Sequence, residues 1–195
     1  MATFRLLLIL AAALFVAFKM SAAGAADVSS PRVMVASPSL AGPYAKTVLI
    51  ALPAGNGTHL GFILNRPTQT KLAALLPDYP PAKQVAAPIF IGGPDIVGPL
   101  FALVRSTSAP GTGSLEVVPG LYLALQESDV DRVISSFSSD ARFFVGLVTW
   151  QSGELEAELG AGAWHVLVPD VDLVLDSGAD TLWSRLMARL RSVTT

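Results

Sequence analysis

The chain has 195 residues, of which 52% are hydrophobic and 14% charged, with no cysteine and a formal net charge of −2. Residues 1–26 hold 21 of the hydrophobic residues, and the other 169 residues are 47% hydrophobic, which is ordinary for a globular domain. This composition excludes a polytopic membrane protein, a disordered chain, a coiled coil and a disulfide scaffold, and the length favours one domain.

The first 26 residues have the layout of a secretory signal peptide. Arg5 precedes an unbroken apolar run of 13 residues, at 6–18. A helix of that length covers about 20 Å and falls short of the ~30 Å hydrocarbon core of a bilayer. Small residues follow the run, as they do before a signal peptidase site. We therefore predict cleavage after Ala25 or Ala26 and a periplasmic or secreted mature protein, with an uncleaved anchor as the alternative.

Removal of this segment would leave an acidic protein. The segment contains two basic residues and no acid, so the net charge of residues 27–195 is −4. The only basic grouping is Arg185, Arg189 and Arg191, near the end of a predicted terminal helix, where cations complement the helix dipole. Nucleic-acid binders usually carry a basic stripe. We therefore expect no nucleic acid as partner and no membrane attachment after cleavage.

Short apolar runs broken by Gly and Pro predict eight strands in the remaining chain. They lie at 33–36, 47–52, 60–64, 89–91, 100–104, 121–125, 143–148 and 164–168. Several are apolar on both faces, so we expect them in the middle of a sheet. Helical patterns occur at 71–76, 129–137, 153–159 and 179–190. Because strands outnumber helices and show no regular βαβ spacing, we predict an α+β fold, as one compact domain over 27–195.

Cofactor and metal motifs are missing from the sequence. No Gly-Lys pair is present for a P-loop, and the glycine pattern at 55–61 resembles a dinucleotide fingerprint only loosely, because a strand follows it. We interpret that pattern as a hairpin turn. We predict no cofactor and no metal site; an oxygen-rich site using Asp170, Asp172 and Asp176 with a histidine is the remaining alternative.

A hydrolase is the alternative among enzymes, since a nucleophile and a base need only meet in space. Ser37 and Thr47 are candidate nucleophiles, and His59 and His165 are the only imidazoles. No Gly-x-Ser-x-Gly elbow occurs. A hydrolase would require one of these hydroxyls within hydrogen-bond reach of a histidine in a concave pocket. We assign no catalytic residue and favour a protein that is not an enzyme.

Nine short segments between residues 33 and 183 carry a pattern in their order and spacing. They are VMVASPSL (33–40), GPY (42–44), KTV (46–48), GFILNRP (61–67), IGGP (91–94), VPGLYL (118–123), RFFVG (142–146), GELEAEL (153–159) and GAW (162–164). Together they resemble the YqgE/AlgH family of bacterial proteins. The resemblance implies an α+β fold with a coiled, partly barrel-like mixed β-sheet flanked by helices.

The same resemblance implies little about activity, because the family has no established catalytic residue or cofactor. Some members are labelled transcriptional regulators. An exported protein would have no access to DNA, so export would exclude that role. The chain also departs from the family pattern at 42–43, at 52–54 and at 149–154, where charged and glycine positions are lost. A regulator role is therefore kept only for the case in which the N-terminus is not an export signal.

One candidate binding cleft combines residues of the matching segments with Trp150 and Gln151, which lie in the departing stretch 149–154. Its residues are Asn65, Arg66, Gly92, Gly93, Trp150 and Gln151. Arg66 offers a forked donor for a carboxylate or phosphate, and the two glycines allow a ligand or another chain to approach the backbone. The alternative is that Arg66 pairs internally with Glu154 or Asp95. We expect a binding or interaction protein of unknown biochemical function, whose partner is a protein or a small anionic ligand.

Overall fold

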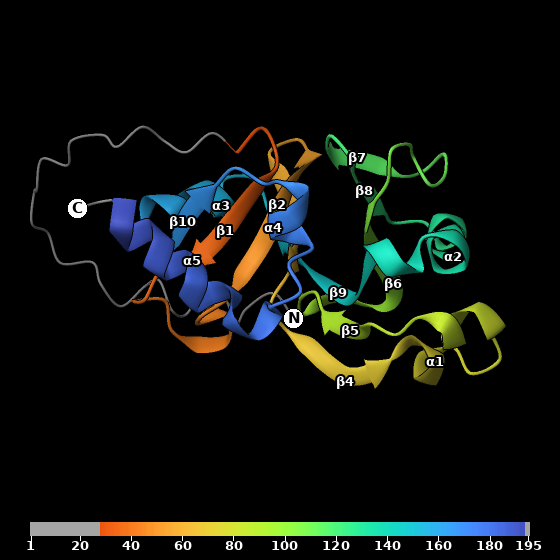
Figure 1. Ribbon diagram of the computed structural model, residues 1–195. Helices are drawn as coiled ribbons and strands as arrows, with labels where there is room; N and C mark the ends of the chain where they lie inside the picture. Colours follow the sequence, from red (N-terminus) through yellow and green to blue (C-terminus); the bar gives the residue numbers. More distant parts are fainter. Residues whose placement is uncertain (1–27, 194–195) are drawn as a thin grey trace, which may run out of the picture.

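The computed structural model describes residues 28–193, which form a mixed α+β single domain (Figure 1). A curled, mostly antiparallel sheet of ten strands makes half a barrel, with five α-helices around it. This confirms the predicted fold class. The predicted signal peptide at 1–26 lies outside the described residues. Within residues 28–193, no helix has the length and apolar character needed to span a bilayer.

All eight predicted strands are confirmed, with shifted ends, and two further strands are present. The strands are β1 (Arg32–Ala36), β2 (Val48–Gly55), β3 (Thr58–Ile63), β4 (Pro67–Lys71), β5 (Pro88–Ile91), β6 (Asp95–Arg105), β7 (Leu115–Val118), β8 (Leu121–Ala124), β9 (Ala141–Trp150) and β10 (Trp164–Leu167). Strands β4 and β7 were not predicted.

The four predicted helices are confirmed as well, and a fifth is short. The helices are α1 (Leu72–Leu75), α2 (Glu127–Ser136), α3 (Glu154–Gly160), α4 (Val171–Val174) and α5 (Ala179–Val193). Three 3-10 turns accompany them: η2 (Gly42–Tyr44), η3 (Pro80–Gln84) and η4 (Ser138–Asp140). Only α4 has no counterpart among the predicted helices.

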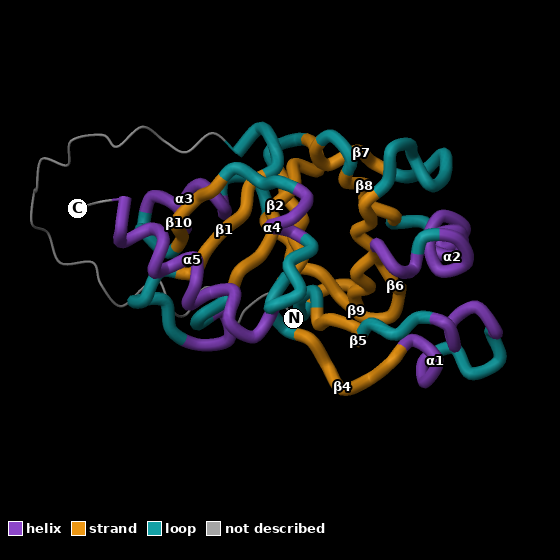
Figure 2. Tube along the Cα trace, viewed as in Figure 1, coloured by secondary structure: helices purple, strands orange, loops and turns teal. Residues whose placement is uncertain are grey.

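The long strand β9 joins the two halves of the sheet. The strand order is β10-β1-β2-β3-β9-β6-β8-β7, and β4 is attached through β5. The first part of β9 pairs with β6 and, in parallel, with β5, whereas its last residues pair with β3. Gly146, with φ +72°, stands between these two parts. Figure 2 shows the result, with β1, β2, β10, α3 and α5 on one side and β6, β7, β8 and α2 on the other.

The hairpin between β2 and β3 explains the glycine pattern at 55–61. Gly55 pairs with Thr58, so Asn56 and Gly57 form a two-residue loop. Both have positive φ, at +50° and +73°. A type I′ turn needs this conformation at both positions, and Asn-Gly is its preferred sequence. The hairpin interpretation is therefore confirmed.

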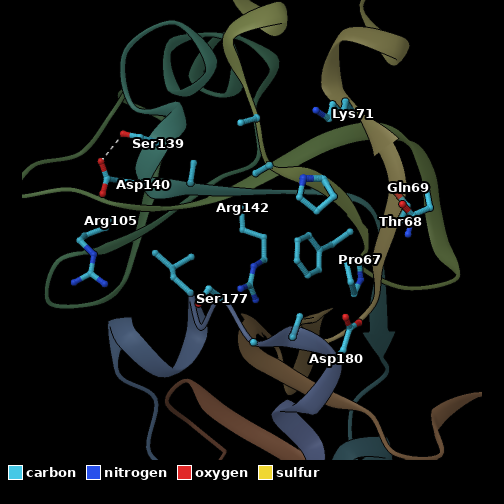
Figure 3. Close-up of a pocket in the computed structure, with 18 of the residues that line it drawn as sticks. Pro67, Thr68, Gln69, Lys71, Arg105, Ser139, Asp140, Arg142, Ser177 and Asp180 are labelled. Carbon is cyan, nitrogen blue, oxygen red and sulfur yellow. Dashed lines mark hydrogen bonds between the residues drawn. The ribbon is translucent and has the colours of Figure 1, made fainter.

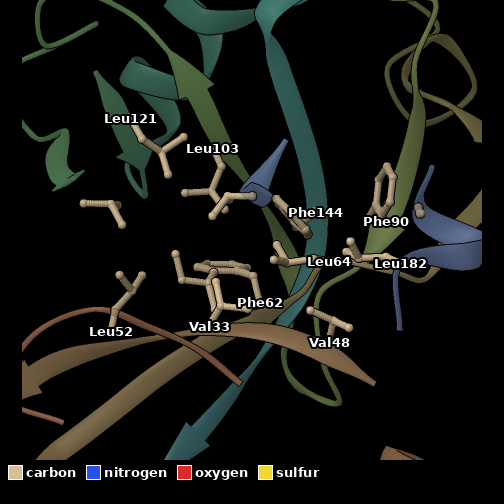
Figure 4. Close-up of a cluster of buried hydrophobic side chains, with 14 of the residues drawn as sticks. Val33, Val48, Leu52, Phe62, Leu64, Phe90, Leu103, Leu121, Phe144 and Leu182 are labelled. Carbon is tan, nitrogen blue, oxygen red and sulfur yellow. The ribbon is translucent and has the colours of Figure 1, made fainter. Parts of the chain in front are cut away.

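The largest core cluster lies on the face of the sheet that α4 and α5 cover. Phe62 is surrounded there by side chains from both halves of the sheet, including Val33, Leu103 and Phe144 (Figure 4). The apolar stripe of α5 packs into the same cluster, so it faces the protein's own sheet. On the other side, β1 and β2 contribute to a second cluster beneath α3, as expected for strands that are apolar on both faces.

Candidate ligand-binding cleft

Asn65 lies just after β3 and ties the start of β2 to it. Its Oδ1 accepts a hydrogen bond from the N–H of Val48 at 2.8 Å, and its Nδ2 donates to the carbonyl of Lys46 at 2.9 Å. Both bonds go to the backbone. The amide of Asn65 is thus used to hold the turn.

Arg66 is paired within the chain too. It donates to the hydroxyl of Thr47 at 2.8 Å and to the carbonyl of Pro43. The internal partners are therefore a hydroxyl and a carbonyl in place of the expected Glu154 or Asp95. Both of those acids accept hydrogen bonds from the last part of β9 and the residue that follows it.

Gly92 and Gly93 lie after β5, against the middle of β9. The N–H of Gly92 donates to the carbonyl of Val145 at 2.9 Å, and its carbonyl accepts from the N–H of Ile63 at 2.8 Å. A Cβ atom on Gly92 would collide with the carbonyl of Gly146, and one on Gly93 with the β9 backbone that follows. The close backbone approach inferred for these glycines is present, and the neighbour is the chain's own strand.

Trp150 and Gln151 lie at the opposite end of β3 from Arg66. Trp150 pairs with His59, near the start of β3, and the seven steps from His59 to Arg66 cover roughly 20 Å of extended chain. The Trp150 indole is buried and donates to Glu158 at 3.2 Å. The structure therefore does not bring Trp150 and Gln151 to the Arg66 turn, and the six residues do not line one cleft.

The hydroxyls proposed for a hydrolase have other partners. Ser37 shares a 2.6 Å hydrogen bond with Ser39, and Thr47 accepts the bond from the arginine described above. His59 is buried and its Nε2 bonds a backbone carbonyl, whereas His165 is exposed on β10. Among residues 28–193, no hydrogen bond joins either hydroxyl to a histidine.

The three aspartates of the metal alternative are engaged separately. Asp170 caps α4 by accepting from the N–H of Leu173 at 2.8 Å, Asp172 pairs with Arg105 at 2.6 Å, and Asp176 pairs with another arginine. The part of the chain that the structure describes contains no group of three or more His, Asp or Glu side chains arranged to hold a metal ion.

A different cavity, of about 860 Å³, lies between β4 and the connection from α4 to α5 (Figure 3). The start of β9 forms its floor, and the residues before β5 complete the wall. The labelled side chains that surround it are Pro67, Thr68, Gln69, Lys71, Arg105, Ser139, Asp140, Arg142, Ser177 and Asp180. Its volume is within the range of small-molecule sites.

Arg142 is the central charged group of this cavity. It is 6% exposed, and its guanidinium donates to the carbonyls of Leu64 at 2.9 Å, Val174 at 3.0 Å and Asp176 at 2.5 Å. It also stacks over the ring of Phe90, 4.4 Å from the centroid. These bonds use three of the five N–H donors of a guanidinium. Within residues 28–193, no carboxylate forms an ion pair with Arg142.

The charge of Arg142 is thus compensated mainly by carbonyl dipoles. Burial lowers the pKa of Arg142 to about 10, and the nearby charge of Asp176 acts in the opposite direction. The group remains protonated at neutral pH. A buried cation without a bonded anion creates a positive potential, which favours an anion in the adjoining cavity.

The rim of the cavity carries charges of both signs. Lys71 and Arg105 are cationic, and Asp140 and Asp180 are anionic. Arg105 is exposed and forms its ion pair with Asp172, which does not line the cavity. Counting Arg142, the lining has three cations and two anions, and with Asp172, the partner of Arg105, included the charges balance. The first residues of α5 also line the cavity, and the amino end of a helix attracts negative charge.

The wall between α4 and α5 is held by an ion pair. Arg185 donates to both carboxylate oxygens of Asp176, at 3.0 and 2.5 Å, and the N–H of Gly178 donates to the same carboxylate at 2.7 Å. The Arg185 guanidinium, followed by this backbone bond, holds the pKa of Asp176 below its usual 3.8. The connection between α4 and α5 is therefore held in two ways: Arg142 binds its backbone carbonyls, and Arg185 binds the Asp176 carboxylate.

Sequence reasoning did not select Arg142 as a site residue. The signal available was a lone arginine at the head of the apolar run 143–148, within one of the segments on which the family resemblance rests. An arginine in that position is equally compatible with an exposed strand end. All three acceptors are more than thirty residues from Arg142 in sequence, so the burial could only be seen in the folded chain.

Fold and cavity together define a single-domain α+β protein with a half-barrel sheet and a polar cleft beside its central strand. The chain belongs to the AlgH-like family, whose model matches residues 33–194. This confirms the family resemblance. The family consists of uncharacterised proteins, and the unknown biochemical function expected from the sequence agrees with it.

Relatives and solved structures agree with this assignment. A UPF0301 protein of Chlorobium phaeobacteroides is 29% identical over 160 residues, which covers 80% of this chain and 83% of that one. The solution structure of the AlgH protein from Pseudomonas aeruginosa matches with a TM-score of 0.70 and 26% identity, over 88% of this chain and 93% of that one. The crystal structure of a Corynebacterium diphtheriae protein matches in fold, with a TM-score of 0.69 and 20% identity, over 84% and 87% of the two chains.

Proposed function

We propose that this protein binds a small anionic ligand in the cleft floored by Arg142 and is not an enzyme. The observation that carries the proposal is the guanidinium itself, which is 94% buried beside a cavity of about 860 Å³ and bonded to carbonyls without a carboxylate. Burying a charge is costly unless an opposite charge compensates it. An anion in the cleft would supply that compensation.

The neighbouring groups support an anion with a carboxylate or phosphate group. Two N–H donors of Arg142 remain beyond the three bonds to carbonyls, and a guanidinium matches the paired oxygens of such groups. Lys71 and the first turn of α5 lie along the same cavity. Phe90 and Pro67 add apolar surface for the rest of the ligand.

The proposal is tested by adding a negative charge to the cleft without touching Arg142. Ser177 lines the cleft, is exposed and has no hydrogen bond from its side chain to other described residues. Ser177→Glu should weaken the binding of inorganic phosphate or succinate about tenfold, since two like charges in a partly screened site repel by roughly 1–2 kcal/mol. Titration calorimetry on the purified protein measures the affinity.

Ser177→Gln is the matched control, because it has the same size and no charge. It should bind these anions as the unaltered protein does, and both variants should unfold at the same temperature as that protein. Equal affinities for the two variants, or no binding of either anion by the unaltered protein, would contradict the proposal.

We further propose that the ligand is bound outside the cytoplasm, after removal of the N-terminal segment. The support is the charge and apolar pattern of residues 1–26 and the acidic remainder. Fractionation of the source cells followed by N-terminal sequencing should find the protein in the periplasm or medium, beginning at Ala26 or Asp27. A cytoplasmic protein that keeps Met1 would exclude export and return the regulator role to consideration.

A further inference from the structure

Asp180 is an acid of the Arg142 cleft that has no partner among residues 28–193. It is exposed in the first turn of α5 and lines the cavity. Its carboxylate makes no hydrogen bond or ion pair with the described part of the chain. Asp140, the other acid of the lining, accepts a hydrogen bond from the hydroxyl of Ser139 at 2.8 Å. A ligand can therefore engage Asp180 without breaking a bond within the protein.

The charges of the cleft balance before any ligand binds. Arg105 is neutralised by its partner outside the cavity, which leaves two cations, Arg142 and Lys71, and two anions, Asp140 and Asp180. A ligand with only a negative charge would compensate Arg142 and leave the occupied cleft negative, and like charges in one site repel. A ligand that also carries a positive charge would keep the occupied cleft neutral. The lining thus favours a ligand with both charges.

Arg142 and Asp180 approach the cavity from different elements. Arg142 comes from the start of β9, at the floor, and Asp180 comes from α5. Figure 3 shows the Arg142 side chain reaching down from its strand and the Asp180 carboxylate pointing up from the helix, next to Pro67. No ion pair joins the two groups, so they do not neutralise each other. A cavity of about 860 Å³ has room for a molecule that contacts both.

We propose that the ligand of the cleft is a zwitterion of the amino acid class, whose carboxylate binds Arg142 and whose ammonium group binds Asp180. This inference rests on the proposed function, because it assigns the anionic group of that ligand to a molecule that also carries an amine. The free N–H donors of Arg142 match the two oxygens of a carboxylate. An ammonium group has three donors, which the Asp180 carboxylate and the Ser177 hydroxyl can accept.

The test compares amino acids with acids that have the same length and no amine. γ-Aminobutyrate and pentanoate differ only in an ammonium group in place of a methyl group. The series from glycine to ε-aminocaproate, each with its own matched acid, varies the distance between the two charges. At least one amino acid should bind the purified full-length chain about threefold to fivefold more tightly than its matched acid, as expected for an ion pair at a partly exposed site. NMR titration measures both dissociation constants.

Substitutions at Asp180 identify the group that recognises the amine. Asp180→Asn should weaken the binding of that amino acid about threefold to fivefold, the whole contribution of the ion pair. It should leave the binding of the matched acid unchanged or tighter, because it removes a negative charge from the cleft. Asp180→Glu keeps the charge and should keep the preference for the amino acid. Asp78→Asn makes the same change at an exposed position outside the cavity and should alter neither affinity.

The outcomes separate this inference from the proposed function. The zwitterion proposal is overturned if every amino acid binds no more tightly than its matched acid, or if Asp180→Asn has the same effect as Asp78→Asn. In both cases the plain acids still bind, and the anion site at Arg142 stands. If neither the acids nor the amino acids bind the unaltered protein, the proposed function fails, and the zwitterion proposal fails with it.

Discussion

Replacing Gly93 with alanine is expected to lower the free energy of unfolding by about 3 kcal/mol, and the melting temperature by about 10 °C. The added Cβ atom would overlap the backbone of Leu147 and Val148. A backbone cannot turn aside as a flexible side chain can, so β5 and β9 would have to move apart. That movement would break the hydrogen bonds that Gly92 makes to both sides at 2.8 and 2.9 Å. Urea denaturation followed by circular dichroism measures the loss.

Gly160→Ala is the control for this substitution. Gly160 ends α3, has an ordinary φ and has no atom within 4 Å of its Cβ position. The same chemical change should therefore alter the free energy of unfolding by no more than about 1 kcal/mol, and in the stabilising direction. If Gly93→Ala unfolds at the same urea concentration as Gly160→Ala, the strands do not cross as closely as described.

The glycines at 92 and 93 illustrate what could be predicted from sequence. Two adjacent glycines followed by Pro94 indicated a close backbone approach, and that was correct because the signal is local. The approaching group could not be predicted, since β9 lies some fifty residues further along the chain. Most strands were predictable for the same reason as the glycines, because an apolar run is a local property.

The missed strands and the misplaced cleft have a common physical cause. Strand β4 carries the sequence PTQTK, which has no apolar alternation, and it exists because it pairs with β5. Arg66 and Arg142 both adjoin apolar strands, and only the tertiary structure decides which guanidinium is buried beside a cavity. Interactions between distant segments override local pattern in each case. The candidate site could therefore be identified only from the three-dimensional structure, whereas the fold class could be predicted from the sequence.

Arg142→Ala is expected to be the most destabilising change in the cleft, at about 3–5 kcal/mol, because hydrogen bonds from a charged donor contribute roughly 1.5–3 kcal/mol each. The buried carbonyls of Leu64 and Val174 and the partly buried carbonyl of Asp176 would lose their donor together. Arg142→Lys keeps the charge and one donor nitrogen, so it should lose about half as much. Chemical denaturation of both variants, beside Arg189→Ala on the exposed face of α5 as control, gives the comparison.

In Arg142→Ala, the connection between α4 and α5 should lose stability before the rest of the domain does. The carbonyls of Val174 and Asp176 lie in the connection between α4 and α5, so without Arg142 that wall is held mainly by the Asp176–Arg185 pair. A partly exposed pair contributes about 1 kcal/mol or less, which is not enough to replace the three hydrogen bonds of Arg142. Hydrogen exchange at the amides of 174–181 should therefore accelerate in Arg142→Ala under conditions where β1 and β2 remain protected. Uniform acceleration across the chain would show that Arg142 supports the whole domain equally, and that the wall of the cleft does not depend on it in particular.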